Sequence, residues 1–290
     1  MFKSKWFLYA LTTVIFWGIC GAFINAPAEA GFPATLGYVV WAFTMIIPAV
    51  ISLPRVHWKI EHDKKSILLG CIIGFTGAGG QLILFEALRG GPAYLIFPII
   101  SLSPVITIIL SMLFLKEKTK LKGCIGIVIA LIAIGLLSYM PNTGGATKGF
   151  LWIILTLLVF LAWGLQAFTM KLANNTMTAE SIFFYMMITG LILIPFALLL
   201  TNFSAPINWG LSGPYLAAGV QVLNAIGALT LVFAFRYGKA IVVSPMANAL
   251  APVLTVIISL SLYHVIPSAI TSLGVILAIA SAVLLAVEEA

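Results

Sequence analysis

Ten stretches of about 20 consecutive, mostly apolar residues occupy most of this 290-residue chain. A helix needs about 20 such residues to cross the hydrocarbon core of a bilayer. Lipid permits only helices or closed barrels, because exposed backbone groups find no water there, and runs this long lack the alternation of barrel strands. The sequence therefore predicts an all-α membrane protein. The ten expected spans are 6–24, 34–53, 66–88, 92–115, 121–140, 149–170, 181–201, 212–236, 240–262 and 267–287.

The composition supports this fold class. Hydrophobic residues make up 62% of the chain and charged residues only 8%, with a mean hydropathy of +1.17, whereas a soluble domain has about 45–50% apolar and about 25% charged residues. A soluble enzyme, a disordered chain and a nucleic-acid-binding module are thereby disfavoured. Cys20, Cys71 and Cys124 lie within apolar runs without metal-ligand or disulfide spacing, so we expect buried thiols and neither a metal nor a cofactor.

The net charge of +7 comes from basic residues in alternate connections between the spans. With the N-terminus in the cytoplasm, all of the 15 lysines and arginines except Arg89 and Lys148 fall on the cytoplasmic side. Such asymmetry orients membrane proteins, so both termini are predicted to be cytoplasmic in a multi-pass protein of the cytoplasmic (inner) membrane. The expected partners of this charge are lipid headgroups and not nucleic acid.

The chain also repeats itself. Arg89, Gly91 and Pro98 recur 147 residues later as Arg236, Gly238 and Pro245, and Trp17-Gly18 recurs as Trp163-Gly164. Each half holds five expected spans, and an odd number makes the second copy enter the membrane from the opposite side. The sequence thus predicts two inverted repeats, 1–140 and 149–290, joined by the linker 141–148. Inverted repeats are typical of transporters in which a central site alternates between the two sides of the membrane.

Several segments resemble one family of transporters. The first half has ALR at 87–89, LSPV at 102–105 and FLKEK at 114–118, and the second half has AFRY at 234–237 and APVL at 251–254. This pattern resembles the EamA-type drug/metabolite transporters, and the resemblance implies ten helices in two copies and transport of metabolites, amino acids, nucleotide sugars or drugs. The second copy departs from the pattern, with His264-Val265 where the first has Lys116-Glu117.

Two spans carry paired prolines well inside the membrane. Each proline removes a helical hydrogen bond and clashes with the carbonyl four residues earlier, and irregular backbone at this depth is tolerated only inside protein or beside a water-filled cavity. We therefore expect these spans to line the cavity and to bend during transport; kinks that only improve packing are the alternative. The prolines are Pro98, Pro104, Pro245 and Pro252. The loosened carbonyls belong to Tyr94, Ile100, Ile241 and Asn248.

Polar and aromatic side chains near the span midpoints are the candidate solute contacts. Amides in hydrocarbon are costly unless they are hydrogen-bonded, and rings attract apolar or cationic solutes. Interhelical hydrogen bonding and packing are the alternative roles of these side chains. Close helix packing is the predicted role of the glycines of the third span, with a moving hinge as the alternative; they are Gly70, Gly74, Gly77, Gly79 and Gly80. The candidates are Asn224, Asn248, Trp17, Trp163, Gln81, Gln166, Tyr94, Ser101 and Tyr185.

Glu86 is the one carboxylate predicted well inside a span, and intramembrane ionisable groups are candidates for function. It lies three residues before Arg89, a spacing that permits an ion pair on a helix, and its repeat equivalent is Phe233. A structural ion pair is the preferred hypothesis, and a proton or cation site that couples transport to a gradient is the alternative.

These observations predict a secondary transporter and not an enzyme. The chain has no G-x-S-x-G elbow, H-E-x-x-H helix or glycine-rich phosphate loop, and it has only one aspartate, Asp63. We expect alternating-access transport of a small organic solute (an amino acid, an amphipathic compound or a cation), with export favoured by the resemblance. The alternatives are an importer of a quaternary-ammonium or sugar-type solute, a channel or a scramblase. The oligomeric state is left open, and a monomer is compatible with the sequence.

Overall fold

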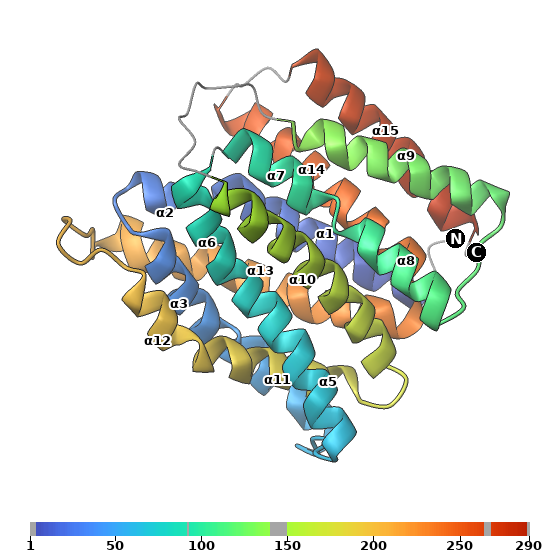
Figure 1. Ribbon diagram of the computed structural model, residues 1–290, viewed down its shortest axis with the longest axis horizontal. Helices are drawn as coiled ribbons and strands as arrows, with labels where there is room; N and C mark the ends of the chain where they lie inside the picture. The colour runs from blue at the N-terminus through green and yellow to red at the C-terminus, as the bar shows by residue number, and fades with distance from the viewer. Residues whose placement is uncertain (1–3, 92, 140–149, 264–267, 289–290) are drawn as a thin grey trace.

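The computed structural model describes residues 4–91, 93–139, 150–263 and 268–288, and the predicted linker 141–148 lies outside these residues. All regular elements within them are helical, which confirms the all-α part of the predicted fold class (Figure 1). The first half contains α1 (Lys5–Phe23), α2 (Ala26–Glu29), α3 (Ala34–Thr44), α4 (Ile46–Ser52), η1 (Leu53–Val56), α5 (Lys64–Gly74), η2 (Phe75–Gly79), α6 (Gly80–Gly90), α7 (Ala93–Ser101), α8 (Pro104–Phe114) and α9 (Leu121–Leu137). The second half contains α10 (Leu151–Ala173), α11 (Ala179–Ile192), α12 (Ile194–Leu199), η3 (Leu211–Tyr215), α13 (Leu216–Tyr237), α14 (Ala240–Tyr263) and α15 (Ala269–Glu288).

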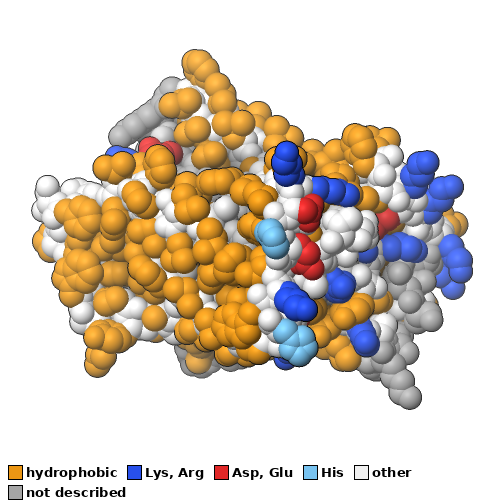
Figure 2. All heavy atoms as spheres, turned by 90° about the horizontal axis from the view of Figure 1, so that it is seen from below, with side chains coloured by type: hydrophobic (Ala, Val, Ile, Leu, Met, Phe, Trp, Pro, Cys, Tyr) orange, Lys and Arg blue, Asp and Glu red, His pale blue; other side chains and the backbone are white. Residues whose placement is uncertain are grey.

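Nine helical segments of the described chain are long and apolar enough to cross a membrane, and Leu121–Leu137 forms a further, shorter apolar helix. The expected span 121–140 corresponds to this shorter helix. The segments run back and forth, so that both termini lie at one end of the bundle and α2 lies at the other (Figure 1). Figure 2 shows most of the visible lysine and arginine side chains near one end, while hydrophobic side chains cover the remainder of that face.

The third span is continuous but not uniform, because a π-helical segment, η2, separates α5 from α6. All of its glycines except Gly79 stand against the side chains of α10 and α11 so closely that a methyl group would collide with them. Small residues of this kind allow helices to approach each other, so the packing role explains these positions. The contacts are Gly70 with Tyr185, Gly74 with Thr189, Gly77 with Gln166 and Gly80 with Trp163.

The two proline-bearing spans differ from each other. The fourth span is broken between α7 and α8, and Pro104 begins α8, where its missing N–H costs nothing. At the break the carbonyl of Ile100 accepts from the backbone N–H of Ser103 at 3.0 Å, a tighter turn than an α-helix makes. In the second half, α14 continues from Ala240 to Tyr263 with Pro245 and Pro252 inside it. The equivalent sequences therefore adopt different backbones in the two halves.

Tryptophans at equivalent positions make equivalent contacts across the two halves. The indole Nε1 of Trp17 on α1 donates to the carbonyl of Asn224 on α13 at 3.2 Å. The indole Nε1 of Trp163 on α10 donates to the carbonyl of Gly77 in η2 at 3.3 Å. Asn224 follows Gly77 by 147 residues, so each repeat receives the same hydrogen bond from the other.

Two threonines repeat this pattern. The hydroxyl of Thr255 on α14 donates to the carbonyl of Gly18 at 3.0 Å, and the hydroxyl of Thr107 on α8 donates to the carbonyl of Gly164 at 3.0 Å. Thr255 follows Thr107 by 148 residues, and Gly164 follows Gly18 by 146. The two halves are thus joined by reciprocal contacts, the arrangement that an internal twofold relation produces.

The Gly80→Ala variant is expected to destabilise the protein, because its new methyl carbon would lie 2.6 Å from Nε1 of Trp163. Overpacking of this kind costs about 1–3 kcal/mol. Gly135→Ala on α9 is the matched control, since nothing lies within 4 Å of the methyl group it would add. Thermal unfolding of both purified variants in detergent tests this; equal midpoints for the two would contradict the packing role.

Candidate functional site

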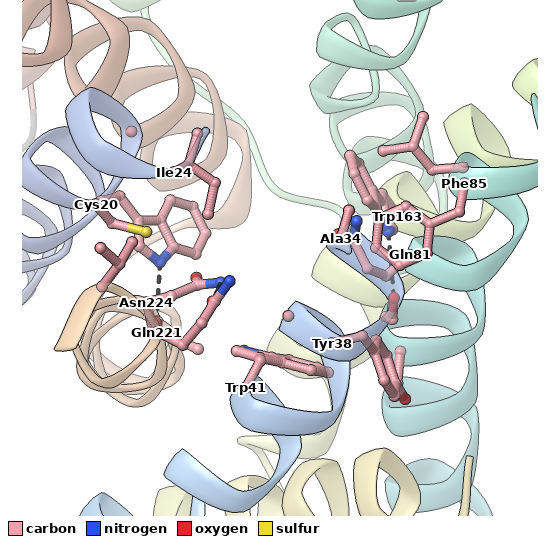
Figure 3. Close-up of a pocket in the computed structure, with 18 of the residues that line it drawn as sticks. Cys20, Ile24, Ala34, Tyr38, Trp41, Gln81, Phe85, Trp163, Gln221 and Asn224 are labelled. Carbon is pink, nitrogen blue, oxygen red and sulfur yellow. Dashed lines mark hydrogen bonds between the residues drawn. The ribbon is translucent and has the colours of Figure 1, made fainter. Parts of the chain in front are cut away.

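A cavity of about 600 Å³ lies between the two repeats. Figure 3 shows Cys20 of α1 with Gln221 and Asn224 of α13 on one side of it, and Gln81 and Phe85 of α6 with Trp163 of α10 on the other. Tyr38 and Trp41 of α3 lie between these two walls (Figure 3). Each wall therefore combines a helix of the first repeat with a helix of the second, as an inverted-repeat architecture leads one to expect.

Six of the candidate solute contacts line this cavity. They come from five different spans, since two of them lie on α10, so the fold brings together positions that are far apart in the chain. They are Trp17, Gln81, Trp163, Gln166, Asn224 and Asn248.

The polar groups of the cavity are amides and hydroxyls. The side-chain Nδ2 of Asn224 donates to Oε1 of Gln221 at 3.2 Å, and Nδ2 of Asn248 donates to the carbonyl of Ser244 at 2.9 Å. These bonds orient the two asparagines. Each amide also has an oxygen with two acceptor positions, so the wall offers both donors and acceptors to an occupant.

None of the described lining residues is an Asp, Glu, Lys, Arg or His. A full localised charge would therefore lose its hydration without meeting an opposite charge, which is costly in such surroundings. The indole N–H groups of Trp17 and Trp163 are engaged with backbone carbonyls, and these bonds fix the planes of the two rings. The arrangement suits a solute with an apolar or ring-stacking body and a few hydrogen-bonding groups.

Of the other three candidates, Ser101 and Tyr185 are not among the described lining residues. The hydroxyl of Ser101 donates to the carbonyl of Phe97 at 2.7 Å within its own helix. The hydroxyl of Tyr185 donates to the carbonyl of Glu61, in the loop before α5, at 2.8 Å. The side chain of Tyr94 lies outside the described residues, as does that of Pro98.

The ion pair permitted by the spacing of Glu86 and Arg89 is present, with Nη1 2.7 Å from Oε1. Both side chains are exposed, Arg89 at 68% and Glu86 at 37%, and neither lines the cavity. An exposed ion pair of this kind contributes little to the stability of the folded protein.

Several lining residues are not among the candidates predicted from the sequence, among them Tyr38, Phe85 and Gln221. Gln221 carries a usable signal, because it precedes Asn224 by three residues and so shares a helix face with it. Tyr38 and Phe85 carry none: an aromatic residue in an apolar helix has the same local sequence whether it faces lipid, protein or cavity.

Glu61 ties the loop before α5 to the start of α11. Its carboxylate accepts from the backbone N–H of Thr178 at 3.2 Å and from the Thr178 hydroxyl at 3.0 Å. Burial raises the pKa of this carboxyl, but hydrogen bonds from Ser181 and Thr178 together lower the pKa below its ordinary value. The backbone carbonyl of the same residue, Glu61, accepts the hydrogen bond from Tyr185, so the Tyr185 hydroxyl has a structural partner outside the cavity.

Comparison with known proteins gives a family match over both halves. The sequence model of the EamA-like transporter family matches residues 4–139 and 150–287. An uncharacterized protein of Methanocaldococcus jannaschii is 33% identical over 131 residues, which are 45% of this chain and 94% of that relative. An uncharacterized transporter of Archaeoglobus fulgidus is 30% identical over 138 residues, 47% of this chain and 48% of that protein. Each match thus spans about half of this chain.

A protein of known crystal structure has the same fold. It superposes with a TM-score of 0.77 over 98% of this chain and 99% of its own, at 15% sequence identity. Identity this low supports a shared architecture and carries no information about the solute.

The Glu61→Gln variant tests the loop contact through pH. Because the folded pKa is lowered, ionised Glu61 stabilises the protein above its ordinary pKa of 4.5, and this contribution is lost as the pH falls below that value. The thermal midpoint of the unmodified protein should therefore fall more steeply below about pH 5 than that of Glu61→Gln. Glu29→Gln, at an exposed carboxylate, should behave like the unmodified protein; an equally steep fall in Glu61→Gln would refute the assignment.

Proposed function

The chain belongs to the EamA-like transporter family, and from that premise we propose that it is a secondary carrier that moves a small organic solute by alternating access. Membership makes it a membrane transporter, a family role that is in general not enzymatic. The observation that carries the proposal is the uncharged cavity between the two repeats, lined by tryptophan rings and amides. A cavity bounded by both repeats is where alternating access requires the solute to bind.

The proposed topology has ten spans, with Leu121–Leu137 as the fifth and with both termini in the cytoplasm of the cell. The positive charges near the termini support this orientation. The cavity extends to the opposite end, where Asn25, Pro27 and Phe32 line it. In this orientation the structure is an outward-facing state. We also propose that prolines allow the fourth and ninth spans to bend. They are Pro104 at the break between α7 and α8, and Pro245 and Pro252 inside α14.

The proposed solute is an amino acid, an amphipathic compound or a cation with spread charge, and export is the proposed direction. Rings and amides without a formal charge support such a solute, because ring faces attract delocalised cations and amides pair with its polar groups. Import of a quaternary-ammonium or sugar-type solute is the alternative that the same lining supports. A channel is less well supported, since side chains of α10 contact the end of α13 and close the bundle near the termini.

Solute counterflow in proteoliposomes tests the function. A metabolite panel is first screened for thermal stabilisation of the purified protein, since a ligand that binds the folded state raises its apparent stability. The labelled hit should then accumulate transiently in vesicles preloaded with the unlabelled compound, with a saturable initial rate. A rate that rises linearly with concentration and shows no counterflow would indicate a channel.

The Asn248→Ala variant tests the cavity as the solute site. Loss of one hydrogen bond to the solute costs about 0.5–1.5 kcal/mol, so KM for counterflow should rise about two- to tenfold with little change in thermal stability. Asn175→Ala is the matched control, because Asn175 is exposed and outside the cavity. Equal KM values for both variants and the unmodified protein would remove Asn248 from the site.

A further inference from the structure

One end of the bundle is closed by polar contacts between α10 and α13. They join the last turn of α10 and the residues after it to the carboxyl end of α13, where the carbonyl of Phe235 is one of the last four of the helix and has no helical partner. We name Lys171, Asn174 and Arg236 the closed-end latch. Lys171 Nζ donates to the carbonyls of Phe235 at 2.9 Å and Gly238 at 2.6 Å, Asn174 Nδ2 to Val232 at 3.0 Å, and Arg236 Nη1 to Met177 at 2.9 Å.

The repeat places an equivalent of each latch residue at the other end of the bundle. Subtracting the 146 residues that separate Trp163 from Trp17 gives Asn25 for Lys171, Ala28 for Asn174 and Gly31 for Met177. Subtracting the 147 that separate Arg236 from Arg89 gives Phe85 for Val232, Leu88 for Phe235 and Gly91 for Gly238.

These equivalents stand on the two sides of the cavity. Asn25 and Ala28, at the end of the first span, line it, and so do Phe85 and Leu88 of α6. The same two helix ends that touch at the closed end are therefore separated by open space at this end.

Arg89 has a local partner in this open arrangement. Its equivalent Arg236 reaches across to the carbonyl of Met177, whereas Arg89 pairs with Glu86 one turn earlier on its own helix. The repeat equivalent of Glu86 is Phe233, whose ring stacks on Tyr9 at a centroid distance of 4.9 Å. Glu86 thus departs from the repeat, and its ion pair keeps the Arg89 guanidinium on its own helix and away from the open end of the cavity.

We propose that Asn25 and Arg89 are the gating residues that close the open end when the carrier changes state. The Arg89 guanidinium leaves Glu86 and donates to the carbonyl of Gly31, and the Asn25 amide donates to the carbonyls of Leu88 and Gly91. The closed-end latch opens in the same transition, because inverted repeats exchange their conformations between the two states. The proposal rests on the alternating access proposed above, and it assigns Glu86 the role of a restraint on the gate.

The closed-end latch is stronger than the contacts proposed for Asn25 and Arg89 at the open end. The closed end uses the charged Lys171 where the open end has the neutral Asn25, and hydrogen bonds from charged donors are the stronger. The carboxylate of Glu117 also accepts from the N–H groups of Ala240 and Ile241 at 3.1 Å each, which fixes the start of α14, and the sequence has Val265 at the equivalent position. The state in this structure is therefore the favoured one without solute.

Thiol crosslinking detects the closure even when the closed form is a minor population, because the product accumulates. In a background with Cys20, Cys71 and Cys124 replaced by Ala, the pair Ala28→Cys/Phe85→Cys should react with a short bifunctional thiol reagent in lipid nanodiscs. The pair Ala28→Cys/Gln81→Cys, one turn deeper on α6, is the register control and should react far more slowly. Absence of crosslinking for the first pair, or equal rates for both, overturns the proposal.

Variants of the gate change the crosslinking rate in opposite directions. Glu86→Gln frees Arg89 and should raise the rate about two- to fivefold, as suits an exposed ion pair, while Asn25→Ala and Arg89→Gln should lower it. Arg55→Ala, a cation far from the mouth, should leave it unchanged. A rate that does not respond to Glu86 or Arg89 overturns the assignment of these residues. Crosslinking with the expected variant pattern but without counterflow of any solute would instead leave the gate in place and refute the proposed carrier function.

Discussion

The need to satisfy every backbone polar group away from water governs this structure. Continuous helices meet it by themselves, but the interruptions at η2 and between α7 and α8 leave carbonyls that need other donors. Side chains and tight turns supply them: Trp163 donates to Gly77 in η2, and Ser103 donates to Ile100 at the break. Both interruptions belong to spans that border the cavity. The irregular backbone is thus found where protein and cavity, and not lipid, surround it.

The helices and tryptophans around the cavity occupy equivalent positions in the two repeats, but its amide side chains have no amide at the equivalent position. Trp17 and Trp163 make the same bond to opposite repeats, so this framework can serve both states. Among the amides, Gln81 corresponds to Ala228 and Asn224 to Gly77. A symmetric framework with asymmetric polar groups lets the conformational change use the repeat while the solute is recognised by side chains that occur only once.

The four amides among the six cavity-lining candidates could be found from the sequence because polar residues in apolar helices are rare and must face protein or cavity. Trp17 and Trp163 could be found because each precedes a glycine at equivalent positions of the repeat. Tyr38 could not, because nothing in an apolar helix distinguishes an aromatic that faces the cavity from one that packs. Tyr185 shows the converse: it was a plausible contact by depth, but its hydroxyl meets the loop carbonyl of Glu61. That contact joins residues 124 positions apart, and no local pattern records it.

The sequence alone determined that the chain folds as membrane-spanning helices, that it contains an internal repeat, and that it resembles the EamA-type transporters. These features follow from apolar length, charge placement and rare residues at fixed offsets. Only the tertiary structure decided which end is open, which amides share the cavity, and that Arg89 pairs with Glu86 while Arg236 reaches Met177. The physical reason is that the helices are apolar on all sides, so their periodicity does not distinguish lipid from protein, and equivalent sequences take different positions according to their neighbours.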